Sequence, residues 1–575
     1  MKQRMIREPM DLSGTVADIL AKGLVRHGVS VIFGQSLPTA LHLAARRLHI
    51  RQAWYRTENA GGAMADGFAR ISHRVGVVSA QNGPAATLLV PPLSEALKSS
   101  IPLVALIQDV ALTQTDRNAF QEFDHINMFS ACAKWVRRLD QPSRAEDYLD
   151  MAFRAAASGR PGPAILLLPA DLLITPARTG LVQRSQSLGS YPLTRTMPGR
   201  SEIEKAADMI ANASRPIVIA GGGVHLSDAC EALALLQETA SLPVATTVMG
   251  KGSVNEQHPL SVGVVGYFMG TGSATKFQRD LVTNADLVLL VGNRTSQNDT
   301  DSWSLYPTGA RYIHIDADPM ELGRNYEALP LPGDAQLILD EMVKILKIRD
   351  LSKRKNSRHV LERRIEQGRI EHQNEIEQFS FALQNPIRPE HVLAEIDRRL
   401  TPHTIVVADA SYSSIWLANY LQSRKAGMRF LTPRGLAGLG WGLPMAIGVK
   451  IAAPEAPVVC IVGDGGFGHC WSEMEVAKRM NLDLTLVVLN NSILGYQKHA
   501  EDIKFGHHTN AVDMSAVDHV KISEACGCKG IRVQTPDQVA PVLAQASQEK
   551  GLVLVDIVID PEAHPPITSF EMAGV

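Results

Sequence analysis

Two apolar runs that each lead into a short polar motif constrain the fold of this chain most strongly. Residues 458–462 are apolar and precede Gly463-Asp464-Gly465, and the largely apolar residues 484–489 precede Asn490-Asn491. Residues 472–480 between them predict a helix, so we expect a strand, a turn, a helix and a second strand. Because ligands bind at the carboxyl ends of strands in open α/β sheets, both motifs should lie at one binding edge.

The two motifs carry the ligand types of a metal–phosphate site. Asp464 and Asn491 would offer a carboxylate and an amide oxygen, which Mg²⁺ prefers together with phosphate oxygens. Glycines such as Gly463 and Gly465 let the backbone approach phosphates closely. A Gly-Asp-Gly after a strand is by itself most often only a turn, but an Asn pair ending a second strand is much rarer. The segment therefore predicts a site that holds a diphosphate through a metal ion.

Length and composition bound the class of protein. The 575 residues exceed one hydrophobic core and predict roughly three domains. Net charge is −2, and no basic tract predicts nucleic-acid binding. No apolar run reaches the roughly 18 to 20 residues that span a membrane. Residues 1–10 contain three basic side chains and no apolar stretch, so we expect no secretory signal there. The six scattered cysteines predict reduced thiols in a cytoplasmic protein.

Three blocks of alternating strand-like and helix-like segments follow one another, at residues 1–185, 201–345 and 386–575. Continuous apolar strands predict parallel sheets covered by helices on both faces, a doubly wound α/β fold. A polar stretch at 178–200 reads as a linker, and the charged, proline-free residues 351–378 predict a solvated helical connector. The first and third blocks have a similar rhythm without a demonstrable sequence repeat.

The Gly463-Asp464-Gly465 motif, followed after about 24 residues by Asn490-Asn491, resembles the metal and diphosphate motif of the thiamine diphosphate (ThDP) enzymes. The order of the blocks resembles the ThDP decarboxylase-like architecture of pyrimidine-binding, central and diphosphate-binding domains. The resemblance covers nearly the whole chain and is closest to the acetolactate synthase large subunit and its relatives. It implies that Asp464, Asn491 and the carbonyl of Ile493 bind Mg²⁺.

Glu58 begins a second segment with a family resemblance. Residues 56–70 (RTENAGGAMADGFAR) resemble the signature E-x-x-A-x-x-M-A-D-G-[FY]-A-R, with Gly61 at the position of its first Ala. Without the resemblance, Glu58 would be a first-turn carboxylate favoured by the helix dipole. The resemblance implies that it hydrogen-bonds N1′ of the cofactor pyrimidine and so sets up the internal base of the cofactor.

A glycine-rich loop at 435–444 resembles the segment G-x-G-x-M-G-x-G-L-P, with Leu439 at the Met position and Ala437 at a Gly position. The resemblance places Leu439 under the bent cofactor, and both Leu and Met can fill that space. Asp409 and Ser411 end a strand and could meet the diphosphate. The remaining expected cofactor contacts are Gly463, Asp464, Gly465, Gly466, Asn491, Ile493, Leu494, Gly495 and Tyr496.

Residues 119–122 (AFQE), with Lys134 twelve residues after Glu122, match an acetolactate synthase pattern. The resemblance places Phe120 and Gln121 beside the reacting carbon and lets Lys134 attract a substrate carboxylate. The plain alternative is a surface loop followed by a structural lysine.

Departures from the synthase pattern concern substrate choice. Residues 490–505 (NNSILGYQKHAEDIKF) have Tyr496, Gln497 and Ala500 where the synthases have Met, Val and Trp, which predicts a roomier, more hydrophilic pocket. Residues 35–38 (QSLP) replace a Pro-Gly-Gly turn. These departures predict an activity other than that of the biosynthetic acetolactate synthase. His469 and His499 are candidate proton carriers, although a lone His is more often structural.

Glycine runs in the central block occupy positions that bind FAD in acetolactate synthases and ADP in oxalyl-CoA decarboxylases, while in other members the domain is empty. They are residues 221–223, 249–252 and 292–294, followed by 314–319 (HIDADP). Glycine runs alone are weak evidence for a dinucleotide. FAD is therefore a possible, structural cofactor.

The resemblance implies a ThDP- and Mg²⁺-dependent enzyme that decarboxylates a 2-oxoacid and transfers the activated aldehyde to a carbonyl acceptor, as a lyase or transferase. Open alternatives are a non-decarboxylating acyloin or 1,2-diketone lyase or hydrolase, a pyruvate oxidase-like flavin enzyme, and a non-catalytic relative. In this family Glu58 comes from one subunit and Asp464 and Asn491 from its partner, so we expect a homodimer, assembled further into a homotetramer.

Overall fold

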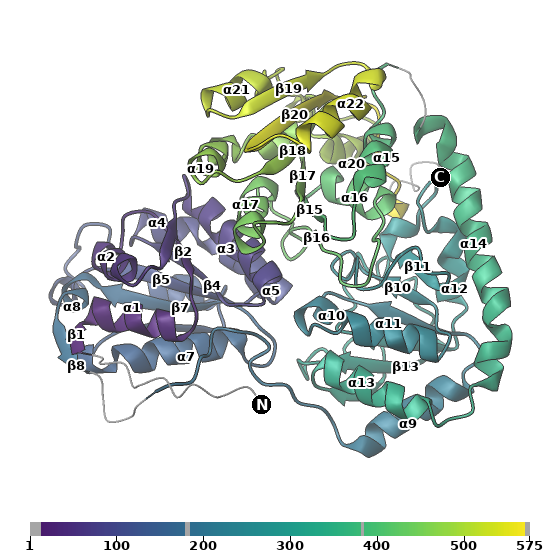
Figure 1. The fold of residues 1–575 in the computed structure, drawn as a ribbon, viewed down its shortest axis with the longest axis horizontal. Helices are drawn as coiled ribbons and strands as arrows, with labels where there is room; N and C mark the ends of the chain where they lie inside the picture. The colour runs from purple at the N-terminus through teal and green to yellow at the C-terminus, as the bar shows by residue number, and fades with distance from the viewer. Residues whose placement is uncertain (1–12, 179–183, 381–384, 570–575) are drawn as a thin grey trace. The chain divides into compact units, whose positions relative to one another are not determined.

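The structure is a computed structural model that describes residues 13–178, 184–380 and 385–569. Residues 1–10, for which we expected no secretory signal, and part of the expected linker lie outside this description. Three six-stranded parallel sheets account for the α/β fold (Figure 1), so the predicted fold class is confirmed. The chain divides into two compact units, Met1–Thr194 with Pro444–Pro454 and Arg195–Leu443 with Glu455–Val575. Across the described ranges, no helix is long and apolar enough to cross a membrane.

The sheet of the first unit has the strand order β3-β2-β4-β5-β7-β6. Its middle strands β4, β5 and β7 are almost entirely buried and consist mostly of Val, Leu, Ile and Ala. A separate antiparallel pair joins β1 to β8. The elements of this unit are β1 (Ser13–Thr15), α1 (Val16–Arg26), β2 (Val31–Phe33), α2 (Thr39–Arg47), β3 (Arg51–Ala53), α3 (Glu58–Ser72), β4 (Gly76–Ala80), α4 (Pro84–Leu88), α5 (Val90–Ser99), β5 (Leu103–Asp109), α6 (His125–Ser130), β6 (Trp135–Arg138), α7 (Ala145–Ala157), β7 (Ala164–Pro169), α8 (Ala170–Leu173) and β8 (Pro176–Arg178).

The central sheet has the order β11-β10-β9-β12-β13-β14. Alternate side chains of β12 enter two different cores: Leu287 and Leu289 pack on one face, and Val288 and Leu290 on the other. Both faces are therefore covered, as a doubly wound sheet requires. The elements are α9 (Arg200–Asn212), β9 (Pro216–Ala220), α10 (Gly223–Leu226), α11 (Cys230–Thr239), β10 (Val244–Thr246), β11 (Ser261–Val264), α12 (Arg279–Thr283), β12 (Leu287–Val291), β13 (Arg311–Asp316), β14 (Leu329–Pro332) and α13 (Ala335–Leu346).

The third sheet has the order β16-β15-β17-β18-β20-β19. Numbered within its own sheet this order is 2-1-3-4-6-5, the same as in the first sheet, which explains the similar rhythm of the two sequence blocks. The elements are α15 (Pro389–Arg399), β15 (Ile405–Ala408), α16 (Tyr412–Tyr420), β16 (Phe430–Leu431), α17 (Gly442–Ala452), β17 (Val458–Gly463), α18 (Asp464–Phe467), α19 (Met474–Arg479), β18 (Leu484–Asn490), α20 (Gly495–Phe505), α21 (His519–Ala525), β19 (Lys529–Val533), α22 (Pro536–Ala546) and β20 (Leu552–Val558).

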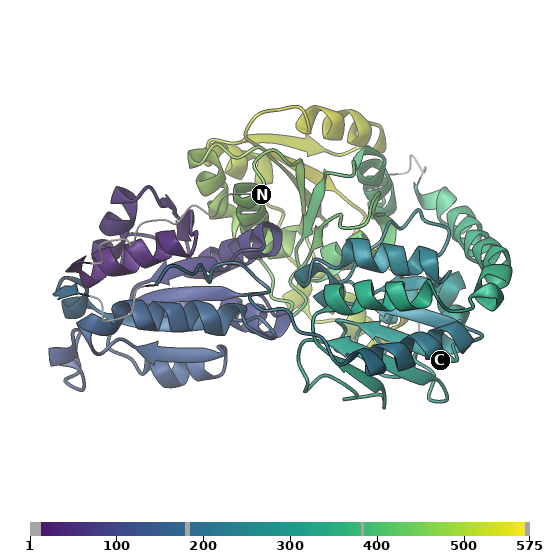
Figure 2. The ribbon, with the colours of Figure 1, turned by 60° about the horizontal axis from the view of Figure 1, so that its bottom comes forward.

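The charged connector is helical, as predicted: α14 spans Ser352–Ser380 and runs along the outside of the central sheet in both views (Figures 1 and 2). Its cations are not all solvated. Arg369 donates to the carbonyls of Glu256, His258 and Ser261 at 2.7–2.9 Å. Ile365 of the same helix is fully buried against the central sheet. The helix is thus fixed to the sheet by backbone contacts and by the apolar side chains of Ile365 and Leu361.

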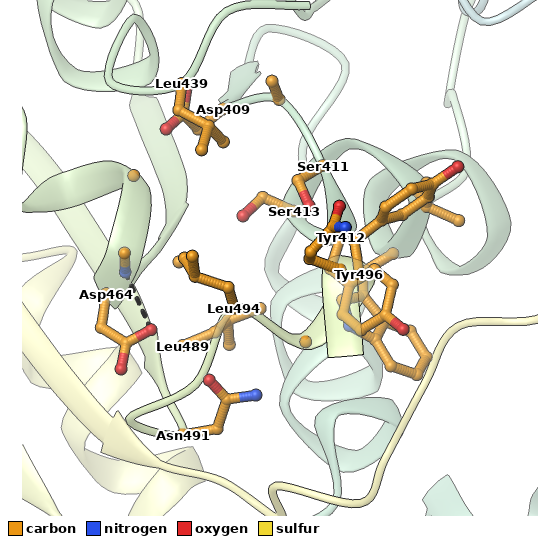
Figure 3. Close-up of a pocket in the computed structure, with 18 of the residues that line it drawn as sticks. Asp409, Ser411, Tyr412, Ser413, Leu439, Asp464, Leu489, Asn491, Leu494 and Tyr496 are labelled. Carbon is orange, nitrogen blue, oxygen red and sulfur yellow. Dashed lines mark hydrogen bonds between the residues drawn. The ribbon is translucent and has the colours of Figure 1, made fainter. Parts of the chain in front are cut away.

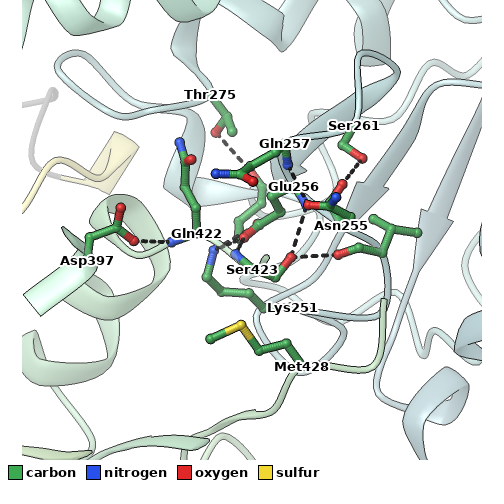
Figure 4. Close-up of polar contacts among 12 residues, drawn as sticks. Lys251, Asn255, Glu256, Gln257, Ser261, Thr275, Asp397, Gln422, Ser423 and Met428 are labelled. Carbon is green, nitrogen blue, oxygen red and sulfur yellow. Dashed lines mark hydrogen bonds and ion pairs between the residues drawn. The ribbon is translucent and has the colours of Figure 1, made fainter. Parts of the chain in front are cut away.

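A buried ion pair joins the central and third sheets within the second unit (Figure 4). The Lys251 ammonium lies 2.8 and 2.9 Å from the two carboxylate oxygens of Glu256, and both side chains are almost inaccessible to solvent. The Ser423 amide, from the segment between α16 and β16, donates to the same carboxylate at 2.7 Å. Its hydroxyl accepts from the Glu256 amide at 3.0 Å. The Lys251–Glu256–Ser423 latch therefore connects the two sheets at a fixed point.

Candidate active site

The carboxyl edge of the third sheet forms a pocket of about 470 Å³ (Figure 3). Its walls come from the ends of β15, β17 and β18 and from the loop between β16 and α17. Parallel strands bring these ends together although they are up to about 80 residues apart in the sequence. Twelve of the expected cofactor contacts line it: Asp409, Ser411, Leu439, Gly463, Asp464, Gly465, Gly466, Asn491, Ile493, Leu494, Gly495 and Tyr496.

The expected metal ligands lie together at one end of this pocket, where Asp464 and Asn491 face each other (Figure 3). Asp464 accepts from the amides of Gly465 at 2.9 Å and Ser492 at 2.6 Å, which fixes the direction of its carboxylate. Burial raises the pKa of the Asp464 carboxyl, a cost that a bound cation would offset. No group of three or more His, Cys, Asp or Glu able to hold a metal occurs in the described part of the chain. A cation here would thus take one carboxylate with amide, carbonyl and phosphate oxygens, the ligand set that suits Mg²⁺.

Asp409 fixes the glycine-rich loop of the pocket. Its fully buried carboxylate accepts from the amides of Gly440 at 2.9 Å and of Trp441 and Gly442 at 3.1 Å. Three such bonds hold the loop firmly, because breaking them would leave a buried carboxylate unsatisfied. Leu439, next to these amides, is thereby held in the pocket wall with 37% of its surface exposed. This is the open apolar surface that a cofactor resting on Leu439 would cover.

The start of α16 forms another part of the wall. Ser411 adopts φ 64°, in the left-handed region, and directs the chain into the helix. Ser411, Tyr412 and Ser413 all line the pocket, so the first amides of a nine-residue helix lie beside it. A helix N-terminus with small hydroxyl side chains favours a phosphate group. Tyr412 and Ser413 were not among the expected site residues, although they directly follow Ser411.

Two residues from loops of the central sheet and one from the third sheet complete the pocket, and sequence reasoning missed them. Tyr267 follows β11, Asn298 follows β12, and Arg434 lies in the loop after β16. The Asn298 carbonyl accepts from the Tyr267 amide at 2.9 Å, which joins the two central loops. Only the basic character of Arg434, just before the glycine-rich loop, was a visible signal in the sequence.

The two expected proton carriers differ in their surroundings. His499 on α20 contacts the Tyr412 hydroxyl through Nδ1, and its ring centroid lies 4.8 Å from that of His564. Burial, followed by the nearby His564 and Lys498, lowers the pKa of His499 to about 4, so the ring is neutral at neutral pH. His469 is exposed near the glycine-rich loop. Neither histidine is among the residues that line the pocket, but His499 contacts one of them, Tyr412.

Glu58, in the first unit, begins α3. Thr57 is the N-cap of the helix and its hydroxyl accepts from the Ala60 amide at 3.3 Å. Burial raises the pKa of the half-buried Glu58 carboxyl, while its own backbone amide acts in the opposite direction. Gly61, which departs from the signature, packs on Tyr55: a Cβ there would lie 2.1 Å from the Tyr55 ring. The departure is therefore explained by the size of this tyrosine.

Phe120 and Gln121 lie on a well-held loop of the same unit. The Gln121 side chain accepts from Gln81 at 2.6 Å, and Asn82 donates to its carbonyl at 3.0 Å. Gln121 has φ 62°, and Phe120 is 85% exposed. The loop thus lies beside the carboxyl end of β4, a suitable edge for a binding residue.

The structure does not bring Lys134 to that edge. Lys134 immediately precedes β6 and so lies at the amino end of the parallel sheet. Its ammonium donates to the carbonyls of Ser158 at 2.8 Å and Arg160 at 2.6 Å, just after α7. This contact satisfies carbonyls near a helix end, which is the structural role that the sequence left open.

The glycine turns of the central sheet pack on one another. The amides of Gly221 and Gly223 donate to the carbonyls of Val291 and Gly292 at 2.8 and 3.1 Å. A Cβ at Gly221 would lie 2.2 Å from the Gly292 carbonyl oxygen. Close loop packing therefore accounts for these glycines, and two of the three amides in the run are unavailable to a phosphate. Lys251, in the next glycine motif, is likewise engaged by Glu256. These residues do not fit a flavin phosphate cradle.

Three family models match the chain in sequence order. They describe the N-terminal TPP binding domain, the central domain and the C-terminal TPP binding domain of thiamine pyrophosphate enzymes, at residues 14–128, 203–342 and 409–557. The chain belongs to the thiamine pyrophosphate enzyme family, and it is an enzyme of the ThDP-dependent decarboxylase and carboligase type.

Within this family the chain is similar to acetolactate synthase large subunits. It is 33% identical to a probable acetolactate synthase large subunit of Methanococcus aeolicus, over 95% of this chain and 92% of that protein. It is 33% identical to a probable large subunit of Methanocaldococcus jannaschii, over 96% and 93%. It is 31% identical to the acetolactate synthase isozyme 3 large subunit of Escherichia coli, over 96% of both chains.

Proposed function

We propose that this protein uses ThDP and Mg²⁺ to decarboxylate a 2-oxoacid and to transfer the activated aldehyde to a carbonyl acceptor. One observation carries the proposal: Asp464, Asn491, Leu439 and the first residues of α16 line a single pocket at a parallel-sheet edge. When bound, ThDP supplies an electron sink for a carbanion next to a carbonyl carbon.

The pocket residues and the expected site residues of the first unit each have a proposed task. Asp464, Asn491 and the Ile493 carbonyl would hold Mg²⁺, and the amides at the start of α16 would bind phosphate oxygens. Leu439 would support the cofactor from below. The Glu58 carboxyl would hydrogen-bond the pyrimidine N1′ and so favour the tautomer that accepts a proton. Gln121 and Phe120 would contact the reacting groups, and His499 would hold Tyr412 in the pocket wall.

Removal of the metal carboxylate tests the cofactor site. In Asp464→Asn, the Kd for ThDP at saturating Mg²⁺ should rise at least about 10- to 100-fold, the loss typical for outer partners of a metal site. The Kd should rise because the substitution replaces the one carboxylate among the proposed Mg²⁺ ligands by a neutral amide. Titration monitored by tryptophan fluorescence measures the Kd. Asp537→Asn, which neutralises an exposed carboxylate in the first turn of α22, serves as the control. Equal affinity of the two variants would contradict the assignment.

A second reaction type has one observation in its favour. Tyr496 and Gln497 both line the pocket, where the synthase pattern has apolar residues. A polar wall suits an acyloin or a 1,2-diketone, cleaved without loss of CO₂. A pyruvate oxidase-like flavin enzyme lacks comparable support, because the central glycine turns pack on one another.

The test of the proposed function starts with the molecules released from the denatured protein, identified by mass spectrometry and absorbance. CO₂ release is then measured with a panel of 2-oxoacids. ThDP with CO₂ release would support the proposal and identify the donor. ThDP without CO₂ release from any acid would favour the acyloin or diketone lyase. Failure to bind ThDP with added Mg²⁺ would overturn both, and released flavin would restore the FAD alternative.

The assembly belongs to the same proposal. We propose domain limits at 1–185, 201–345 and 386–575, because each limit encloses one six-stranded sheet. The family resemblance supports a homodimer in which Glu58 of one subunit serves the metal site of the other, and a tetramer of two such dimers. A cytoplasmic location would suit the six free cysteines, four of which are buried.

A further inference from the structure

Arg434 places a positive charge in the pocket wall and is not one of the residues proposed above to bind the metal or the phosphate. Its Nη2 donates to the Tyr267 hydroxyl at 2.7 Å, and its Nη1 donates to the Ser414 hydroxyl at 3.1 Å. The guanidinium carbon lies 5.6 Å from the centroid of the Phe268 ring. The side chain is thus held from two sides by hydroxyls and packed on an aromatic ring, which fixes the direction of its remaining N–H groups.

The fixed partners of Arg434 are neutral. In the part of the chain that the structure describes, no carboxylate forms an ion pair with its guanidinium. Asp299 acts on it electrostatically without a direct contact, and the carboxylate of Asp299 accepts from the Ser296 hydroxyl at 2.6 Å. A half-buried cation without a paired anion is costly. An anionic ligand in the pocket would remove that cost.

We propose that Arg434 binds the carboxylate of the substrate and so makes this pocket selective for 2-oxoacids over neutral carbonyl compounds. This inference rests on the proposed ThDP-dependent function of the same pocket. A planar guanidinium matches a carboxylate with two parallel hydrogen bonds, which gives orientation as well as affinity.

The alternative anion is the cofactor diphosphate, and the arrangement of the pocket favours the carboxylate. Asp464 and Asn491 mark the metal end, while Tyr496 lies on the other side of the pocket, next to Tyr412 (Figure 3). Arg434 donates to the Tyr267 hydroxyl at 2.7 Å, so the guanidinium lies beside the part of the pocket wall that the central sheet contributes. A diphosphate held by a cation at the metal end and by the amides at the start of α16 would leave the part of the wall beside Tyr267 to the substrate.

Equilibrium binding of an unreactive probe tests the inference without turnover. Oxamate is a carboxylate with the shape of pyruvate. Its Kd is measured on the Mg²⁺–ThDP-loaded protein for the wild type, Arg434→Gln and Arg434→Lys, and the ThDP Kd is measured for each. Lys425→Gln removes one exposed positive charge from the chain segment before β16 and controls for net charge. Thermal melting confirms that each variant is folded.

We expect Arg434→Gln to weaken oxamate binding about 10- to 100-fold, as the loss of a charge-assisted pair does. Its ThDP Kd should stay within about 3-fold of wild type, a change of less than 1 kcal/mol. The oxamate Kd of Arg434→Lys should lie between those of the wild type and Arg434→Gln. An ammonium keeps the positive charge but cannot form the two parallel hydrogen bonds of a guanidinium. Lys425→Gln should bind both ligands like wild type.

Three results would overturn the inference. The first is a raised ThDP Kd with unchanged oxamate binding, which would make the diphosphate the partner of Arg434. The second is oxamate binding that is equal in Arg434→Gln and Lys425→Gln. The third is wild-type protein that does not bind oxamate. Arg434-dependent oxamate binding without CO₂ release from any 2-oxoacid would support carboxylate recognition and refute the decarboxylation, so the two failures are distinguishable.

Discussion

Glu58→Gln is expected to lower turnover about 10²- to 10⁴-fold, the range for loss of a proton-transfer contribution. The substitution keeps the size of the side chain and the N-terminal turn of α3, whose cap is Thr57. It removes only the carboxylate that would hydrogen-bond N1′, so the ThDP Kd should change little. Steady-state turnover of the best 2-oxoacid and a ThDP titration measure the two quantities.

Glu231→Gln is the matched control for this prediction. Glu231 is an exposed first-turn glutamate of α11 and therefore undergoes the same change in the same kind of helix position. It should leave turnover at the wild-type level. Glu58→Gln with wild-type turnover would refute the role of Glu58, and a parallel loss of ThDP binding would show that the side chain holds the cofactor rather than activating it.

Glu256→Ala is expected to lower the free energy of unfolding by about 3 to 5 kcal/mol, because it leaves the buried Lys251 ammonium without its counter-ion. It also removes the acceptor of the Ser423 amide, which binds the carboxylate at 2.7 Å. Urea unfolding measures the loss. Glu549→Ala, which breaks the exposed pair with Lys529, should cost at most about 1 kcal/mol.

A double variant separates the charge from the packing. Lys251→Met with Glu256→Gln removes both charges and keeps an acceptor for Ser423. It should be more stable than Glu256→Ala, because neither charge is then buried alone. A double variant that is as unstable as the single one would show that the packing of these side chains, and not charge pairing, holds the two sheets.

The interior of the fold was predictable because buried parallel strands are apolar throughout. The strands β17 and β18 contain the apolar runs 458–462 and 484–489 that predicted them. Edge strands lack this signal: β3 is the short, half-polar Arg51–Ala53 and β16 has two residues. The sequence also did not reveal that the first and third sheets have the same strand order, because strand order does not produce a periodic pattern in the sequence.

That Asp464 and Asn491 line one pocket could be predicted because one sheet edge gathers motifs that directly follow strands. Asp464 and Asn491 are such residues. The part of the pocket that Tyr267, Asn298 and Arg434 form could not be predicted, since it depends on how loops of the central sheet meet the third sheet. Lys134 differs from these residues: the resemblance let it attract a substrate carboxylate, but the structure places it at the start of β6, at the opposite edge of the sheet.

The attachment of α14 determines where this chain can be divided into independently folding fragments. A fragment that ends before Ser352 would lose Ile365 from the core of the central sheet and Arg369 from three backbone carbonyls. A fragment that contains the central sheet therefore has to include α14, although the charged sequence of this helix is typical of a linker. A recombination point at residue 350 would separate two parts of one folding unit.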